Sequence, residues 1–200
     1  MTDEQKAAVE AVAMDMWEPY IQAVRETLAK AKIVFDLFHV VAAYGKVIDQ
    51  VRISEYRRAS AQDREVLKGS KYLLLKTRLP RREDREHLQR LLALNETLFF
   101  VHLLRDMLKT IWRYRHRTWA ARALAEWCSL AREVGHPELE RFARMLERHR
   151  EGILNHCHYP IHTSKLEGTN NTIKVIKRQA YGYHDSEYFV LKVKQAFAPT

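Results

Sequence analysis

The sequence contains few of the residues that build disulfide-linked, repetitive or unfolded chains. Its 200 residues include only two cysteines, six glycines and five prolines. Cys128 and Cys157 have no CxxC neighbour, which excludes a disulfide framework and a cysteine-rich zinc site. With 46% apolar residues and so little glycine and proline, the chain is not collagen-like, of low complexity or disordered. We therefore expect a folded protein with two reduced thiols.

Long apolar runs are also absent from the sequence. It has no stretch of about 18 apolar residues that could form a membrane-spanning helix. Residues 1–6 lack the basic and then apolar order of a secretory signal. The length suits one core with an insertion. These observations predict a soluble, cytoplasmic protein without a membrane partner.

Basic residues exceed acidic ones, and they are unevenly distributed. Lys and Arg number 34 against 25 Asp and Glu, a net charge of +9 that is typical of proteins that bind polyanions such as DNA. Residues 101–122 hold six basic residues and one acidic residue, interleaved with three aromatic ones. Arg113, Arg115 and Arg117 are candidate DNA contacts, because guanidinium groups neutralise phosphates while aromatic rings stack on bases. The alternative is a helix with solvated arginines whose aromatic residues face a core.

The N-terminal part has the pattern of a strand, a helix and a second strand. Residues 9–14 alternate weakly between apolar and other residues and end on Asp15, and a helix begins near Pro19. Residues 31–35 form a short apolar strand that ends on Asp36. Such a βαβ unit makes the two strands parallel. Both aspartates then lie at the carboxyl edge of the sheet, where the sites of open α/β sheets are found.

Helical periodicity replaces the strand pattern after this unit. Residues 41–158 repeat apolar positions at helical spacing and are too many for a loop. We therefore expect three parts: a partial core over 1–40, a helical insertion over 41–158 and a return to the core over 159–200. In the last part, a helix over 163–178 carries Glu167 in its first turn. The predicted fold class is α/β and predominantly helical.

Four segments follow one another in an order and spacing that are typical of one family. They are DMWEPY at 15–20, IVFDLFHVV at 33–41, KGSKYLLLK at 68–76 and EGTNNTIKVIKRQAYGY at 167–183. Together they resemble the DDE transposases of bacterial insertion sequences, in the branch called ISL-three, and the resemblance runs from about residue 12 to about residue 195. It implies the second part of a ribonuclease-H-like core, a βαβ unit plus a late catalytic helix, interrupted by a large all-helical insertion.

The resemblance also implies the catalytic residues. Such transposases use two Asp and one Glu to hold two divalent ions, usually Mg²⁺, and Asp15 corresponds to the second Asp and Glu167 to the Glu. Carboxylate oxygens suit Mg²⁺, and phosphodiester hydrolysis or transfer uses one ion at the attacking oxygen and one at the leaving oxygen. Taken alone, Asp15 would fit equally well as a helix N-cap before Trp17.

Further residues are implied as supports of the site and as DNA contacts. Asp36 and His39 match an Asp-x-x-His feature beside the family's active site, although a purely structural hydrogen-bonded pair is the alternative. The implied supports and DNA contacts on the helix of Glu167 are Asn170, Asn171, Lys174, Lys177 and Arg178. A solvated basic helix face is the alternative for these residues.

The family's first catalytic Asp, on an upstream strand, has no counterpart in the sequence. Asp3 is the only Asp before Asp15 and lies in a polar segment rather than at a strand end. We therefore expect a transposase catalytic-domain fragment that neither cleaves nor joins DNA alone. Its expected partners are transposon-end DNA and either a second copy or a full-length transposase. The competing hypothesis is a non-catalytic protein that binds DNA or a transposase through its basic helical part.

Overall fold

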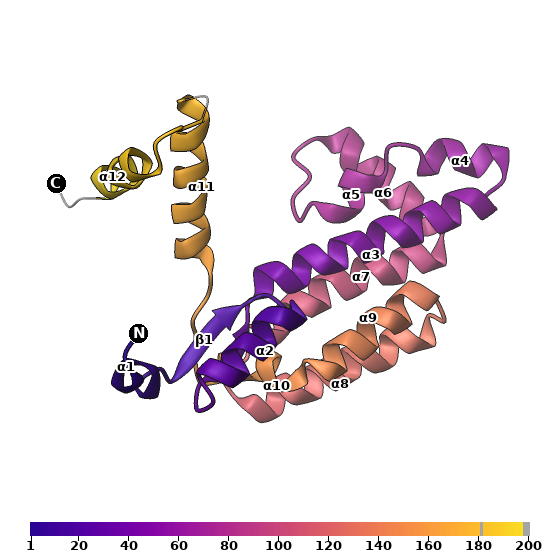
Figure 1. Ribbon diagram of the computed structural model, residues 1–200. Coiled ribbons are helices and arrows are strands. Elements are labelled where there is room, and N and C mark those ends of the chain that lie inside the picture. The colour runs from indigo at the N-terminus through magenta and orange to yellow at the C-terminus, as the bar shows by residue number, and fades with distance from the viewer. Residues whose placement is uncertain (181, 198–200) are drawn as a thin grey trace. The chain divides into compact units, whose positions relative to one another are not determined.

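The computed structural model describes residues 1–180 and 182–197, without the side chains of residues 165 and 166. Tyr181, in the fourth family-like segment, lies outside the described residues. The chain divides into two compact units, residues 1–161 and residues 162–200. Helices dominate both units, and a small sheet lies in the first (Figure 1).

The N-terminal part folds as the predicted βαβ unit. β1 (Ala11–Met14) and β2 (Lys32–Phe35) pair in parallel, with Met14 opposite Phe35. The crossover between them is α2 (Glu18–Thr27), whose first turn contains a proline. The prediction of two short parallel strands in a predominantly helical α/β protein is therefore confirmed.

Helices α3, α7, α8 and α9 form the body of the first unit and lie side by side (Figure 1). At their centre, the buried rings of Tyr44, Trp127 and Phe142 contact one another at centroid distances of 5.1 to 5.5 Å. The Tyr44 hydroxyl donates to the Val101 carbonyl at 3.0 Å. Trp127 Nε1 donates to the Leu104 carbonyl at 2.8 Å, so the polar atoms of both rings are satisfied. The four helices span Leu37–Arg58, Glu96–Ile111, Arg117–Glu133 and Pro137–Arg148.

The third family-like segment, residues 68–76, closes onto this body. Arg105 is buried in α7 and donates hydrogen bonds to the carbonyls of Leu74 and Lys76. The same guanidinium forms two hydrogen bonds with the Asp106 carboxylate. The segment is therefore held by a buried charge that caps the last carbonyls of α5. The shorter helices of the unit are α1 (Asp3–Ala7), α4 (Ala61–Leu67), α5 (Lys71–Leu75) and α6 (Arg82–Leu94).

The helical part also packs against the edge of β2 that faces away from β1. Asn155 Nδ2 donates to the Ile33 carbonyl at 2.8 Å. Trp112 Nε1 donates to the Phe35 carbonyl at 3.4 Å. Both donors occupy the position where a third strand would otherwise pair with β2. β2 is also contacted by α10 (Arg150–Leu154) and by the 3₁₀ turn η1 (Asn155–Cys157) that follows it. Two side chains from the helical part therefore close one edge of the sheet.

Among its described residues, 162–180 and 182–197, the second unit contains two helices. α11 (Ser164–Gln179) is the predicted helix of Glu167. α12 (Ser186–Ala196) contains the last apolar stretch of the chain, and the ring of Tyr183 packs against Phe189. Within residues 1–180 and 182–197, no helix is long and apolar enough to cross a membrane.

Candidate functional site

The carboxyl edge of the sheet carries one aspartate at the end of each strand. Asp15 directly follows β1, and Asp36 directly follows β2. The two strands end in register, because Met14 pairs with Phe35 and the Asp36 N–H donates to the Met14 carbonyl at 3.2 Å. The structure therefore brings the two aspartates to the same edge of the sheet, as the βαβ pattern predicts.

Each aspartate accepts a hydrogen bond from the backbone two residues further on. Trp17 N donates to Asp15 Oδ1 at 3.0 Å, and Phe38 N donates to Asp36 Oδ1 at 3.0 Å. Asp36 is buried, and this bond makes it the N-cap of α3. Asp36 therefore helps to fix the end of β2 and the start of the long helix.

Asp15 is half-buried and differs from Asp36 in its surroundings. In the part of the chain that the structure describes, its carboxylate accepts one hydrogen bond, from Trp17 N, and this bond uses only Oδ1. A carboxylate is a hard oxygen donor of the kind that Mg²⁺ prefers. The chemistry of Asp15 therefore fits a divalent-metal ligand. Within the described residues, no group of three or more His, Cys, Asp or Glu side chains is placed to hold a metal ion.

His39 lies in the first turn of α3, three residues after Asp36. This spacing puts the two residues on one face of the helix start. The His39 ring is half-buried and meets the Phe38 ring edge-on, at a centroid distance of 5.4 Å. The predicted hydrogen bond between Asp36 and His39 stays a prediction.

Glu167 lies in the first turn of α11, in the second unit. Its backbone N–H donates to the Thr163 carbonyl at 2.9 Å, and Thr163 Oγ1 lies 3.5 Å from Glu167 Oε1. The threonine therefore orients the glutamate side chain within its own unit. Asp15 belongs to the first unit, so the two implied catalytic carboxylates lie on separate units of the chain.

The implied partners of Glu167 all lie on α11 and are exposed. Positions 167, 171, 174 and 178 recur at intervals of three and four residues, which puts a carboxylate, an amide and two cations on one stripe of the helix. The exposed residues are Asn170, Asn171, Lys174, Lys177 and Arg178. This stripe offers donors for a phosphate backbone directly beside the carboxylate.

The predicted arginine cluster follows the end of α7 and divides into two kinds. Arg113 and Arg115 are exposed in the loop between α7 and α8. Arg117, by contrast, pairs with Glu151 at 2.5 Å and donates to Asn155 Oδ1 at 3.2 Å. Arg117 therefore holds α8 to α10, whereas the other two present their charges to solvent.

The arginine loop is tied to the sheet. The Tyr114 carbonyl accepts a hydrogen bond from Cys157 Sγ at 3.3 Å and lies 3.1 Å from His156 Nε2. Trp112, at the start of the loop, bonds to the carbonyl of Phe35, the last residue of β2. The loop is therefore positioned relative to the strand that delivers Asp36.

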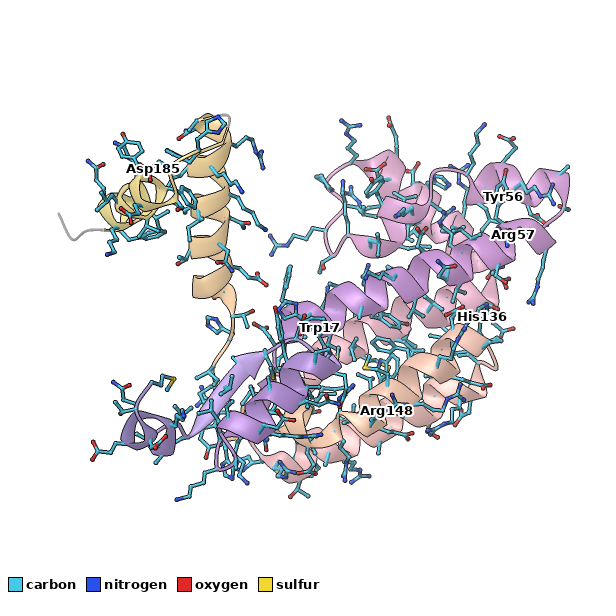
Figure 2. The ribbon with its side chains drawn as sticks, in the orientation of Figure 1. Trp17, Tyr56, Arg57, His136, Arg148 and Asp185 are labelled. Atoms are coloured by element: carbon cyan, nitrogen blue, oxygen red, sulfur yellow. The ribbon has the colours of Figure 1, made fainter. Side chains whose placement is uncertain are left out.

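Sequence reasoning missed one feature of the edge. The residues two positions after Asp15 and Asp36 are both large and aromatic, and both are exposed: Trp17 by 53% and Phe38 by 58%. Figure 2 labels Trp17 where the chain passes from β1 into α2. The repeated order of strand, Asp, any residue and aromatic could have identified this pair.

Comparisons with known proteins identify the family of the chain. A family model described as a transposase, of the DDE type and the ISL3 group, matches residues 1–193. The chain is 44% identical over 193 residues to the transposase for insertion sequence element IS1001 of Bordetella parapertussis, in an alignment that covers 94% of this chain and 48% of the relative. It thus spans about half the length of the curated relative it matches, and no solved structure matches it. Because the family model matches nearly the whole chain, the chain belongs to the ISL3-type DDE transposases.

Proposed function

We propose that this chain contributes to the catalytic domain of an insertion-sequence transposase, which cleaves DNA and transfers strands with the help of divalent metal ions. The observation that carries the proposal is the delivery of Asp15 to the carboxyl edge of a parallel β-strand pair, in a chain of this family. The βαβ unit and α11 would belong to a ribonuclease-H-like core, and the helices between them would be its insertion.

Asp15 and Glu167 would hold the metal, because both present carboxylate oxygens. Bound Mg²⁺ supplies activation of the attacking oxygen and stabilisation of the leaving oxygen. The protein's own part is positioning. The Trp17 N–H fixes one oxygen of Asp15, Thr163 orients Glu167, and Asp36 caps α3 behind the strand end.

The DNA would be held by two sets of exposed cations. Arg113 and Arg115 lie on the loop that Trp112 ties to the end of β2. Lys174 and Arg178 follow Glu167 along one stripe of α11. Each set carries guanidinium or ammonium groups that neutralise phosphates without reading sequence.

We further propose that the chain alone does not complete the metal site. The motifs that match the family supply two carboxylates, whereas the family's site uses three. The third would come from the part of a full-length transposase that this chain does not span. The purified chain should therefore not nick DNA with Mg²⁺ or Mn²⁺, and nicking that Glu167→Gln abolishes would contradict this expectation.

An exchange experiment tests the function directly. This chain replaces the matching residues of the IS1001 transposase, and the hybrid is assayed for strand cleavage at the ends of that element. Asp15→Asn and Glu167→Gln should each remove cleavage and leave DNA binding intact. The matched control is Asp3→Asn, because the side chain of Asp3 is 99% exposed and lies outside the four family-like segments. Cleavage that survives Asp15→Asn would overturn the assignment.

The second candidate function is DNA binding without catalysis. The exposure of Arg113 and Arg115 favours it, since these side chains form no ion pair within the described residues. Under this function, the double change Arg113→Ala and Arg115→Ala weakens binding. The double change also reduces the steepness with which the logarithm of the association constant for DNA falls with the logarithm of the salt concentration, by about one unit for each phosphate that the arginines neutralise. If the hybrid is inactive while the chain still binds DNA through these arginines, binding is the surviving function.

A further inference from the structure

Trp17 stands beside the candidate metal ligand in a fixed and exposed position. Its N–H is bonded to Asp15, and its carbonyl accepts from the N–H groups of Tyr20 and Ile21, which begin α2. Ile21 is 1% exposed and anchors that helix in the core. The backbone of Trp17 is therefore held on both sides, although its side chain is 53% exposed.

A second ring supports the indole. The Tyr20 ring meets the Trp17 ring edge-on, with centroids 4.4 Å apart and an angle of 86° between the planes. An edge-on neighbour orients an aromatic ring without covering both of its faces. Trp17 is therefore a preorganised surface rather than a loosely placed side chain, which lowers the entropic cost of binding a flat ligand.

The position beside Asp15 selects the ligand. Residues two apart in a chain span at most about 7 Å, and successive nucleotides of one DNA strand rise by about 3.4 Å. A phosphate bound through a metal ion on Asp15 would therefore bring the bases on either side of it within reach of the Trp17 ring. Bases inside a duplex have both faces covered by their neighbours, whereas an unpaired base has a free face for an aromatic ring.

We propose that Trp17 stacks on an unpaired nucleobase next to the phosphate that a metal ion on Asp15 would bind, so that the site receives locally opened DNA ends rather than closed duplex. Phe38, in the equivalent position after Asp36, provides a second apolar surface at the same edge. The inference rests on the proposed function, because it takes the DNA phosphate to lie at Asp15.

The test compares two DNA duplexes of the same sequence, one fully paired and one with a few terminal bases left unpaired. Binding to the purified chain is measured by fluorescence anisotropy. The natural chain should bind the opened duplex more tightly by about fivefold or more. Trp17→Ala should remove this difference and leave the affinity for the paired duplex unchanged, and Trp17→Phe should keep part of it.

Tyr72→Ala is the matched control. Tyr72 lies on α5, in the third family-like segment, is 65% exposed and is none of the proposed metal or DNA contacts, so this variant should keep the full preference. A natural chain that binds both duplexes equally, or a Trp17→Ala chain that keeps the preference, would overturn the inference and leave the proposed function standing. If Trp17→Ala changes self-association and leaves the preference for the opened duplex unchanged, the ring belongs to a protein contact. This result would also overturn the inference. If the natural chain binds neither duplex, the DNA contacts of the proposed function fail as well.

Discussion

His102 is the residue whose environment gives the clearest pH dependence. It lies in α7, and its Nδ1 is buried without a hydrogen-bond partner among the residues that the structure describes. Burial, reinforced by the positive charge of Arg105, lowers its pKa below the ordinary value. Burial also lowers the pKa values of His136 and His149. All three histidines therefore resist protonation in the folded state.

The sign of the effect on stability follows from this direction. Because the folded pKa values lie below the unfolded ones, the unfolded chain takes up more protons as the pH falls below about 6.5. We expect the free energy of unfolding to have its full value at about pH 7.5, well above the unfolded pKa, and to be lower at about pH 5.5. Urea unfolding at both pH values measures the decrease, and His102→Gln should reduce it. The Lys71 hydrogen bond lowers the pKa of Asp49, so the stability that this carboxylate contributes is present throughout this pH range and is lost only at lower pH. If the free energy of unfolding of His102→Gln decreases as much as that of the natural chain, the buried His102 is not a source of the pH dependence.

At the scale of elements, the contact between α10 and β2 sets the position of the sheet. A Cβ added to Gly152 would lie 2.4 Å from Cε2 of Phe35, and the Phe35 ring is 3% exposed and packed against His149. The ring cannot move away without disturbing the core. Gly152→Ala should therefore destabilise the protein by about 1–3 kcal/mol in chemical denaturation.

The same substitution elsewhere provides the comparison. Gly45 lies within α3, and an added Cβ would meet Leu75 at 3.4 Å, an ordinary contact distance. Gly45→Ala should be neutral or stabilise by up to about 1 kcal/mol, because alanine favours the helix. Equal destabilisation by the two changes would show that the close approach of α10 to β2 does not control stability.

The elements differ in how far the sequence predicts them. The strands and helices follow from local patterns, such as the apolar run before Asp36 and the glycine and proline on either side of His136. The closing of the β2 edge does not, because Asn155 reaches Ile33 across 122 residues and no local pattern indicates such a contact. Arg117 is an example. The basic and aromatic composition of residues 101–122 predicts that it contacts DNA, whereas the structure pairs its side chain with Glu151.

The sequence also predicts some features of the candidate site and not others. The delivery of Asp15 and Asp36 to one edge follows from the βαβ pattern, and the resemblance implies the position of Glu167 on its helix. The hydrogen bonds from Trp17 and Phe38 to these aspartates do not follow from the pattern, because they depend on the turn geometry after each strand. The sequence places an aromatic residue two positions after each aspartate, but only the structure shows that both rings are exposed.

At the scale of the whole molecule, the buried core and the exposed cations of α11 lie in different units of the chain. The buried apolar side chains of the described residues lie between Met14 and Leu154, in the first unit, and α12 buries none of its residues. The second unit instead carries the exposed cations of α11. We therefore expect a chain that ends at Ile161 to keep the urea midpoint of the full chain, because its core is intact.

The same shortened chain should bind DNA more weakly and with a smaller dependence on salt. Removing Lys174, Lys177 and Arg178 removes up to three phosphate contacts, and each contact accounts for about one unit of the slope of log K against log salt. The charge-reversal variant of the full chain, Lys174→Glu with Arg178→Glu, separates charge from folding: it should weaken binding while its urea midpoint stays unchanged. A shortened chain with a lower midpoint would mean that the second unit stabilises the first, and unchanged DNA affinity would assign the whole electrostatic contact to Arg113 and Arg115.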